Sequence, residues 1–294
     1  DLNYAGRAGY LPVRTQGHPL RGGRASLDAS ISSQFASGLA MIAPLMDQGL
    51  SLELGGNPVS LPYLDLTLSM LTRLGMKAVR NGTQVRVEQG EYPDSMIHVE
   101  PDWSAAAFIY AAVALSPGAQ VRIPGLSLDS AQGDKQAANV FAPLGVNTSS
   151  LDDGIMIRQQ DMASEEPMEA DLRDSPDLLP ALAVAAAMLE RKALFHGMAH
   201  LRVKESDRID AVLSLLRQCG YQASAGPDWL SVQGNTPGHC DPVIDPRNDH
   251  RLAMAFSLLC FRNEVSISNA GCVEKSWPDF WDSLSSLGFR IKQI

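Results

Sequence analysis

The sequence predicts an α/β fold built from a repeated βαβαββ unit. Three observations support this: a recurring glycine after a helical segment, hairpin signals, and two helices that are apolar nearly all round. The glycines recur about 70 residues apart and are Gly75, Gly145, Gly220 and Gly288. A glycine directly after a helix is typical of a left-handed C-cap. Asn81-Gly82 and Asp153-Gly154, each between β-prone runs, predict hairpins.

The first half of each unit is a leading strand followed by a helix. The expected leading strands are Arg24–Ser30, Met96–Val99, Met168–Asp171 and Pro242–Ile244. The expected helices are Ser32–Met46, Asp102–Leu115, Pro176–Leu189 and Asn248–Cys260. Within them, residues 105–115 and 181–189 lack a polar face, so these two helices are expected in the interior.

The second half is a middle strand, a second helix that ends at the glycine, and a hairpin. The expected middle strands are Leu50–Leu54, Ala119–Ile123, Ala193–His196 and Glu264–Ser268. The expected hairpin strands are Lys77–Arg80 with Gln84–Glu88, and Asn147–Leu151 with Ile155–Arg158. Residues 1–23 look like the tail of an earlier unit, with a strand over Asp1–Val13, and the last unit stops after one strand, Phe289–Ile294. An unpaired terminal strand exposes backbone groups, so we expect upstream sequence to supply a closing strand.

The totals describe a soluble globular protein with two domains. The chain has 294 residues, of which 45% are hydrophobic and 19% charged, enough for an extensive core. A break in composition near Pro93–Pro101 predicts a domain of residues 1–100, with the tail and one unit. The second domain, residues 101–294, would hold three units, the last without its closing strand.

Composition also argues against several classes of protein. The net charge of −9 speaks against a nucleic-acid partner. No apolar run reaches the ~18 residues that span a bilayer, so no membrane association is expected. The four cysteines form no CxxC pair, which predicts free thiols, a reducing cytoplasmic location and no metal site. Walker, GxGxxG, HExxH and GxSxG motifs are all absent from the sequence.

Polar side chains gather where the helices begin. The first helices open on Ser32-Ser33-Gln34, Asp102-Trp103-Ser104, Ser175-Pro176-Asp177 and Asn248-Asp249-His250-Arg251. The second helices open near Ser60 and Tyr63, Gly133-Asp134-Lys135, Lys204-Glu205-Ser206-Asp207-Arg208, and Lys275-Ser276-Trp277-Pro278. Backbone N–H groups at helix N-termini favour anions, so convergence of these starts on one face predicts a site for a multiply anionic ligand.

Each of these residues has a structural explanation as well. Serine and aspartate at these positions are ordinary N-caps, and a lone cation is usually a solvated surface charge. His250 and Tyr63 would be packed side chains. What favours a site is the recurrence of cations at equivalent places in the repeat, namely Lys204 with Arg208, Arg251 and Lys275. Asp177 and Glu205, placed among such cations, are candidates for proton transfer.

Six segments of the chain together match the motifs of a known family. They are Ser32-Ser33-Gln34-Phe35, Ser60-Leu61-Pro62-Tyr63, Ser175-Pro176-Asp177, Arg202–Arg208, Asn248–Arg251 and Lys275–Asp279. In order and spacing they resemble the 5-enolpyruvylshikimate-3-phosphate synthases, also called 3-phosphoshikimate 1-carboxyvinyltransferases. The resemblance implies an enolpyruvyl transferase-like inside-out α/β barrel of two domains. It also implies transfer of the enolpyruvyl group of phosphoenolpyruvate to the 5-hydroxyl of shikimate 3-phosphate, with release of phosphate and without metal or organic cofactor.

The resemblance implies roles for the residues at the helix starts. The residues that would hold shikimate 3-phosphate are Ser32, Ser33, Gln34, Ser60, Tyr63 and Lys204, and we add His200, where family members often have Asn. Those that would hold phosphoenolpyruvate are Arg208, His250, Arg251 and Lys275. Asp177 would take the proton from the 5-hydroxyl, Glu205 would protonate the methylene carbon, and Lys204 would assist charge balance.

Family members have six units, whereas this chain has four and a tail. We therefore expect a complementing N-terminal segment of ~140 residues to be needed for activity. An alternative is a non-catalytic fragment that binds shikimate 3-phosphate or assembles with another chain. A further alternative, the sister enzyme acting on UDP-N-acetylglucosamine, shares the fold but is not expected to carry both the Arg202–Arg208 and the Asn248–Arg251 motifs.

Overall fold

The computed structural model describes residues 2–161, 166–235 and 242–293, and the chain forms two compact units. Unit 1 comprises residues 1–29, 34–58 and 64–96, and unit 2 comprises residues 30–33, 59–63 and 97–294. Two short stretches, Ser30–Ser33 and Val59–Tyr63, therefore group with unit 2 although their sequence neighbours belong to unit 1. Both stretches carry predicted substrate-binding residues. The domain boundary expected at residue 100 stays a prediction.

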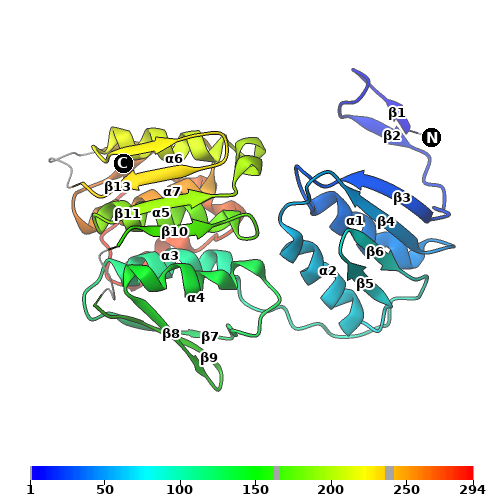
Figure 1. Ribbon diagram of the computed structural model, residues 1–294, viewed down its shortest axis with the longest axis horizontal. Coiled ribbons are helices and arrows are strands. Elements are labelled where there is room, and N and C mark those ends of the chain that lie inside the picture. The colour runs from blue at the N-terminus through cyan, green and yellow to red at the C-terminus, as the bar shows by residue number, and fades with distance from the viewer. Residues whose placement is uncertain (1, 162–165, 236–241, 294) are drawn as a thin grey trace. The chain divides into compact units, whose positions relative to one another are not determined.

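Unit 1 is a mixed sheet with helices on one face (Figure 1). The strand order is β3 (Gly23–Asp28), β4 (Leu50–Gly55), β6 (Gln84–Val87) and β5 (Ala78–Asn81). Strands β3 and β4 are parallel, and β6 is antiparallel to both of its neighbours. The helices are α1 (Gln34–Ile42), η1 (Ala43–Leu45) and the part of α2 (Leu61–Arg73) from Leu64 onward. Because side chains alternate along β4, its buried residues Leu50, Leu52 and Leu54 face the core.

The N-terminal residues form a separate hairpin of β1 (Leu2–Tyr4) and β2 (Val13–Thr15), paired antiparallel. The single strand expected over Asp1–Val13 is therefore wrong. The chain reverses between the two strands, where Gly9 takes a φ of 85°. That positive φ is readily accessible only to glycine, and it cannot continue a strand.

The described residues of unit 2 form three sheets. The first has the order β7 (Gln120–Pro124), β9 (Gly154–Gln159) and β8 (Val146–Leu151). The second has the order β10 (Met168–Asp171), β11 (Lys192–His196), β13 (Leu230–Gln233) and β12 (Ala223–Ala225). The third pairs β14 (Val243–Ile244) with β15 (Ser266–Ile267). In the second and third sheets the first two strands are parallel, as the repeat predicts.

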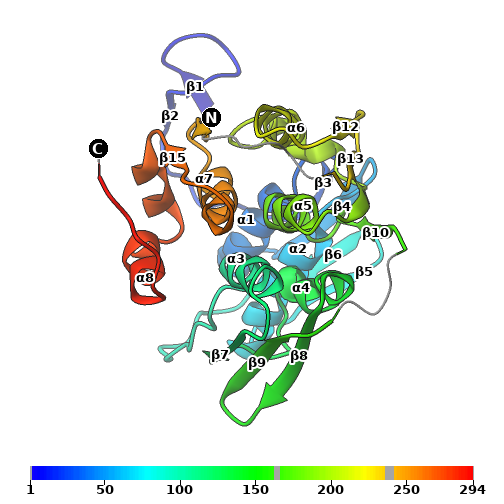
Figure 2. The ribbon, with the colours of Figure 1, turned by 90° about the vertical axis from the view of Figure 1, so that its left-hand side faces the viewer.

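The helices of unit 2 pack around one that has no exposed face. They are α3 (Trp103–Ala114), η2 (Gly133–Gln136), α4 (Ala137–Val140), η3 (Ala142–Leu144), η4 (Pro176–Leu178), α5 (Leu179–Met188), η5 (Ala199–Val203), α6 (Arg208–Gln218), α7 (His250–Ser257), η6 (Leu258–Phe261), η7 (Ala270–Lys275) and α8 (Phe280–Ser286). Every residue of α5 is buried, and Figure 2 shows α5 among α3, α6 and α7. The prediction that 181–189 is an interior helix is confirmed.

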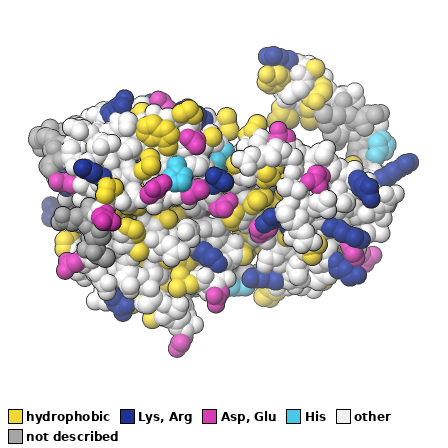
Figure 3. Space-filling model, viewed as in Figure 1, with side chains coloured by type: hydrophobic (Ala, Val, Ile, Leu, Met, Phe, Trp, Pro, Cys, Tyr) yellow, Lys and Arg dark blue, Asp and Glu magenta, His cyan; other side chains and the backbone are white. Residues whose placement is uncertain are grey.

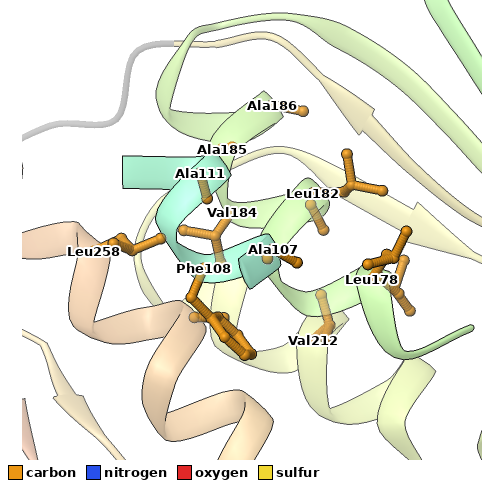
Figure 4. Packing of buried hydrophobic residues seen from close by; sticks show 14 of the residues in the cluster. Ala107, Phe108, Ala111, Leu178, Leu182, Val184, Ala185, Ala186, Val212 and Leu258 are labelled. Atoms are coloured by element: carbon orange, nitrogen blue, oxygen red, sulfur yellow. The ribbon is translucent and has the colours of Figure 1, made fainter. Parts of the chain in front are cut away.

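The packing of α5 depends on its small side chains. Figure 4 shows Ala185 and Ala186 of α5, Ala107 and Ala111 of α3, and Phe108 as members of one buried cluster. Alanine allows two helix backbones to approach closely, and the larger residues then fill what remains at the density usual for protein interiors. A rigid core of this kind fixes where the N-termini of α5, α6 and α7 lie.

The four repeat glycines cap their helices as expected. Their φ angles are 81° at Gly75, 81° at Gly145, 83° at Gly220 and 99° at Gly288. A left-handed residue at this position satisfies the last carbonyl groups of the helix and turns the chain toward the following strand. The prediction of a recurring helix–glycine signal is confirmed.

Three further expected elements differ in the structure. Met96–Val99 forms no strand, because its side chains stay exposed and find no core to cover; Met96 is 100% exposed. Residues 289–293 form no strand either, since they have no neighbouring strand to pair with, and Ile294 lies outside the described residues. The helix before Gly145 is reduced to the short α4 between two 3₁₀ turns, because Pro143 lacks a backbone N–H.

On the face shown in Figure 3, acidic and basic side chains are interspersed. Among residues 2–161, 166–235 and 242–293, no helix is long and apolar enough to cross a membrane.

Candidate functional site

The starts of three helical segments in unit 2 and the end of a fourth carry the predicted ionic residues. Asp177 lies in η4, ahead of α5, and Arg208 is the first residue of α6. His250 and Arg251 open α7, and Lys275 ends η7. The caps hold these starts in place: Asp207 accepts a hydrogen bond from the backbone N–H of Asp210, and Asp249 accepts one from that of Arg251.

Arg208 is the centre of the ionic network and is only 1% exposed. Its Nη1 donates to Asp177 Oδ1 at 2.7 Å, and its Nη2 donates to Glu205 Oε2 at 2.9 Å. Its Nε donates to Asp249 Oδ2 at 2.9 Å. A buried guanidinium needs partners on each of its edges, and three carboxylates supply them. We call this set, with Arg251 and Lys275, the ionic network.

Asp177 is shared by two arginines. Arg251 Nη2 donates to Asp177 Oδ2 at 2.9 Å, while Arg208 occupies the other oxygen. Burial alone would raise the pKa of the Asp177 carboxyl, but Arg251, Arg208 and Lys204 outweigh burial and lower it. Asp177 is therefore an anion in the unliganded protein. Burial works against the charge on Arg251, yet Asp177 and Asp134 hold the pKa of its guanidinium above the usual value.

Glu205 links Arg208 to Lys275. Its Oε2 accepts from Arg208, and its Oε1 accepts from the Lys275 ammonium. Burial would raise the pKa of the Glu205 carboxyl, but the hydrogen bond from Lys275 and the charge of Arg208 lower it to about 2. In this arrangement Glu205 carries no proton at neutral pH.

Two histidines of the site are neutral. His200 is 4% exposed, and its Nε2 lies 3.5 Å from Ser60 Oγ. Burial, followed by the charge of Lys204, lowers the pKa of His200 to about 4. Burial, followed by Arg251, also lowers the pKa of His250. Within the described part of the chain, the buried Nδ1 atoms of His200 and His250 have no hydrogen-bond partner.

The predicted contacts from the serine segments lie partly in the same unit. Ser32, Ser33, Ser60 and Tyr63 all belong to unit 2, and Ser33 Oγ donates to the carbonyl of Ser60 at 2.9 Å. Ser60 has a φ of 55°, a left-handed conformation that a side chain rarely adopts. Gln34 begins α1 and belongs to unit 1.

Sequence reasoning did not place Asp134 or Ser104 in the site. Asp134 is 1% exposed and accepts from Tyr63 Oη at 3.1 Å to each carboxylate oxygen. Ser104 Oγ donates to Asp134 Oδ2 as well. Burial, followed by the charge of Asp177, raises the pKa of the Asp134 carboxyl to about 7. In the sequence, an aspartate at a helix start looks like a cap, and only a partner 71 residues away shows otherwise.

The network as a whole suits a polyanionic ligand. Three cations, Arg208, Arg251 and Lys275, are held by carboxylates of the chain itself. An incoming phosphate or carboxylate would compete for the same donors, and each displaced acidic side chain would then lose the cation that keeps it ionised. Among the residues that the structure describes, His, Cys, Asp and Glu form no group that could hold a metal ion.

Comparison with known proteins gives consistent results. Residues 1–284 match the family described as EPSP synthase (3-phosphoshikimate 1-carboxyvinyltransferase). A 3-phosphoshikimate 1-carboxyvinyltransferase of Bacteroides fragilis is 37% identical over 99% of this chain and 72% of that protein. One of Methanoculleus marisnigri is 36% identical over 98% of this chain and 68% of that protein.

Two solved structures share the fold. The EPSP synthase from Acinetobacter baumannii aligns with a TM-score of 0.78 at 24% identity, over 99% of this chain and 68% of that one. The enolpyruvyl transferase NikO from Streptomyces tendae aligns with a TM-score of 0.69 at 19% identity, over 95% of this chain and 66% of that one. The expected α/β enolpyruvyl transferase-like fold is confirmed.

Proposed function

The chain belongs to the EPSP synthase (3-phosphoshikimate 1-carboxyvinyltransferase) family, and on that premise we propose that the ionic network is where enolpyruvyl transfer takes place. The reaction moves the enolpyruvyl group of phosphoenolpyruvate to the 5-hydroxyl of shikimate 3-phosphate and releases phosphate. The observation that supports this site best is that two carboxylates, Asp177 and Glu205, are each held between two cations.

Phosphoenolpyruvate would bind by exchanging places with the chain's own carboxylates. Its phosphate and carboxylate groups match the donors of Arg208, Arg251 and Lys275, because arginine presents paired N–H groups to such anions. His250, whose pKa is lowered by burial, would add a contact that carries no charge. Each cation would thus keep an anionic partner when the ligand replaces a carboxylate of the chain.

Asp177 would act as the base for the substrate hydroxyl. In the unliganded protein its pKa is lowered, so it is a weak base. When a polyanion takes up the charge of Arg251 and Arg208, less positive charge acts on Asp177, and its pKa rises. The carboxylate then accepts the proton of the 5-hydroxyl as that oxygen bonds to the enolpyruvyl carbon. Lys204, which also lowers the pKa of Asp177, would balance the charge at this step.

Glu205 would act as the acid for the methylene carbon, because ligand binding would raise its pKa in the same way. Its pKa of about 2 depends on Lys275 and Arg208. Once a ligand phosphate binds these cations, the pKa of Glu205 rises and the carboxyl takes up a proton that it can donate to carbon. Ligand binding and protonation of the acid are then coupled.

Shikimate 3-phosphate would be held by the residues from the serine segments and by Lys204. Ser32, Ser33, Ser60, Tyr63 and His200, all in unit 2, are the proposed contacts, and the contact expected from Gln34 of unit 1 stays a prediction. His200 would contribute through its neutral ring, whose Nε2 already lies near Ser60. We also propose a cytoplasmic location, since Cys260 and Cys272 are free thiols, as is usual in reducing compartments.

The test is phosphate release from both substrates together, measured with D177N and E205Q. Both variants should lower kcat by about 10²–10⁴-fold, the range for loss of a general acid or base, while the Kd of shikimate 3-phosphate changes little. Asp171→Asn is the matched control, because Asp171 caps the backbone of Arg173 outside the network and its variant should keep wild-type kcat. Equal kcat in D177N and wild type would contradict the role of Asp177.

The same assay addresses the alternatives. Binding of shikimate 3-phosphate without phosphate release would favour a non-catalytic binding fragment. Turnover that depends on UDP-N-acetylglucosamine in a competition assay would favour the sister enzyme. The expected need for a complementing N-terminal segment stays a prediction without support from the comparisons. Activity of the 294-residue chain alone would contradict it.

A further inference from the structure

Tyr63, Ser104 and Asp134 form a buried cluster from three separate elements, which we call the tyrosine cluster. Tyr63 lies in the first turn of α2, Ser104 in the first turn of α3, and Asp134 in η2. All three belong to unit 2. Asp134 is 1% exposed, and the hydroxyl groups of Tyr63 and Ser104 both donate hydrogen bonds to its carboxylate. Neither capping nor core packing requires a carboxylate in such a place.

The chain is shaped to bring Asp134 under Tyr63. Gly133, the residue before it, lies so close to its neighbours that a Cβ there would be 2.7 Å from the carbonyl oxygen of Asp174. The same Cβ would be 2.8 Å from Cβ of Pro62, the residue before Tyr63. Any side chain at this position would push the two segments apart, so glycine permits the contact between Asp134 and Tyr63.

The cluster also borders the ionic network. The charges of Asp177 and Arg251 both shift the pKa of the Asp134 carboxyl and the pKa of the Tyr63 phenol. The tyrosine cluster therefore lies within electrostatic reach of Asp177 and Arg251, which the proposed function assigns to the substrates.

The contact decides which way the Tyr63 hydroxyl can hydrogen-bond. A phenol has one proton to donate, and here that proton lies between Tyr63 Oη and the Asp134 carboxylate. While Asp134 is ionised, the Tyr63 oxygen can only accept a hydrogen bond from any other partner. Burial, together with the charge of Asp134, also raises the pKa of the phenol well above its usual value, so the proton is not lost.

We propose that Asp134 is a positioning residue that fixes Tyr63 as a hydrogen-bond acceptor for a substrate hydroxyl, and so selects the hydroxylated ring rather than the phosphate. This inference rests on the proposed function for the identity of the substrate. Phosphate oxygens at neutral pH only accept hydrogen bonds, whereas a ring hydroxyl can donate one. Tyr63 thus accepts a hydrogen bond from the hydroxyl of shikimate 3-phosphate at position 4 or 5, and an analogue without that hydroxyl binds less tightly.

The experiment is a double-mutant cycle between protein and ligand. Calorimetry gives the Kd of shikimate 3-phosphate and of its 4-deoxy and 5-deoxy analogues for wild type, Y63F, D134L and D134N. For wild type, removal of the hydroxyl that Tyr63 accepts should weaken binding by about tenfold. In Y63F and D134L the same removal should matter less than about twofold. In D134N, whose side-chain oxygen can still accept from Tyr63, part of the discrimination should return.

Tyr110→Phe is the matched control. Tyr110 is a buried tyrosine of unit 2 whose hydroxyl pairs with Thr148 Oγ1 at 2.9 Å, apart from the tyrosine cluster. Y110F should keep the wild-type preference for the hydroxylated ligand. The same loss of affinity for both deoxy analogues in Y63F as in wild type would overturn the proposal.

A second measurement needs no substrate and separates the two proposals. Carbon-13 NMR of the Asp134 carboxyl reports its pKa, which is about 7 and is set by burial, Asp177, Ser104, Arg251 and Tyr63. Loss of the Tyr63 donor in Y63F should raise that pKa further, because the hydrogen bond favours the charged form. An unchanged pKa in Y63F would overturn the inference even if phosphate release confirms enolpyruvyl transfer. A raised pKa without any turnover would leave the cluster supported and contradict the proposed function.

Discussion

Arg208 and Asp177 show how single residues are held at this site. Each is nearly enclosed by protein, and each has opposite charges on every polar edge. Buried ion pairs add little net stability, because desolvation offsets most of the attraction. Their value here is geometric, since Arg208 ties the starts of η4, α6 and α7 to one another through Asp177 and Asp249.

Replacement of Arg208 should be far more costly than that of an exposed arginine. R208M leaves Asp177, Glu205 and Asp249 without their shared cation, and the free energy of unfolding should fall by about 3–5 kcal/mol. Arg247→Met removes a solvent-exposed pair with Asp210 and should cost less than about 1 kcal/mol. Urea unfolding monitored by circular dichroism measures both. Similar costs for the two variants would show that the buried network contributes no more than a surface pair.

Asp134 should make the protein less stable as pH rises. The pKa of the Asp134 carboxyl is about 7 in the folded protein and 3.8 for the ordinary group, so between these pH values the folded state binds more protons than the unfolded state. The stabilisation that results is fully present below pH 3.8 and is lost as pH rises through about 7. D134N should abolish that loss, on the order of 2 kcal/mol between pH 5 and pH 8. Thermal unfolding at both pH values tests this. Identical pH dependence in D134N and wild type would contradict it.

At the scale of elements, most of the site residues lie where helices begin, and the repeated glycines lie where helices end. Each repeat glycine ends a helix in a left-handed conformation and sends the chain to the next strand. The helix starts then recur at similar places, and their caps and cations fall near one another. Repetition of one unit thus places similar groups around a common site without any single long motif.

Two glycines of unit 1 should respond oppositely to alanine. Gly75 has a φ of 81° and Gly38 lies within α1, and a Cβ at either position meets no atom within 4 Å. Steric crowding is therefore the same, and only backbone conformation differs. G75A should destabilise by about 1 kcal/mol, whereas G38A should stabilise by about 0.5–1 kcal/mol. Chemical denaturation of both variants provides the measurement, and a stabilising G75A would contradict the C-cap assignment.

At the scale of the whole molecule, the chain passes from unit 1 to unit 2 for the last time near residue 96. It has no strand or helix between Val87 and Trp103, and Met96 and Val99 are exposed. Protease cleavage requires a segment that can leave its contacts easily, and such segments are extended and exposed.

Limited proteolysis should therefore cut first within Tyr92–Val99. Thermolysin or chymotrypsin, at a low ratio of protease to protein, is expected to give two fragments before either unit is degraded. The masses of these fragments should place the cut in this range. Mass spectrometry of early time points reads the site directly. A first cut inside α5 or another buried element would argue against a boundary near residue 100.

By itself, the sequence determined the repeat, the interior helices α3 and α5, the C-cap glycines and most of the ionic residues. These are local signals, because periodicity, a glycine after a helix or a charge at a helix start is visible within about one turn of chain. The identity of the family also follows from short motifs of this kind.

Tertiary structure alone decided which partners those residues have. It joined Tyr63 to Asp134 across 71 residues, and Asp177 to Arg251 across 74. It also left Met96–Val99 unpaired, although its composition suits a strand. The physical reason is common to all three: burial, ion pairing and strand pairing depend on what the rest of the chain places opposite a residue, and no local pattern encodes that neighbour.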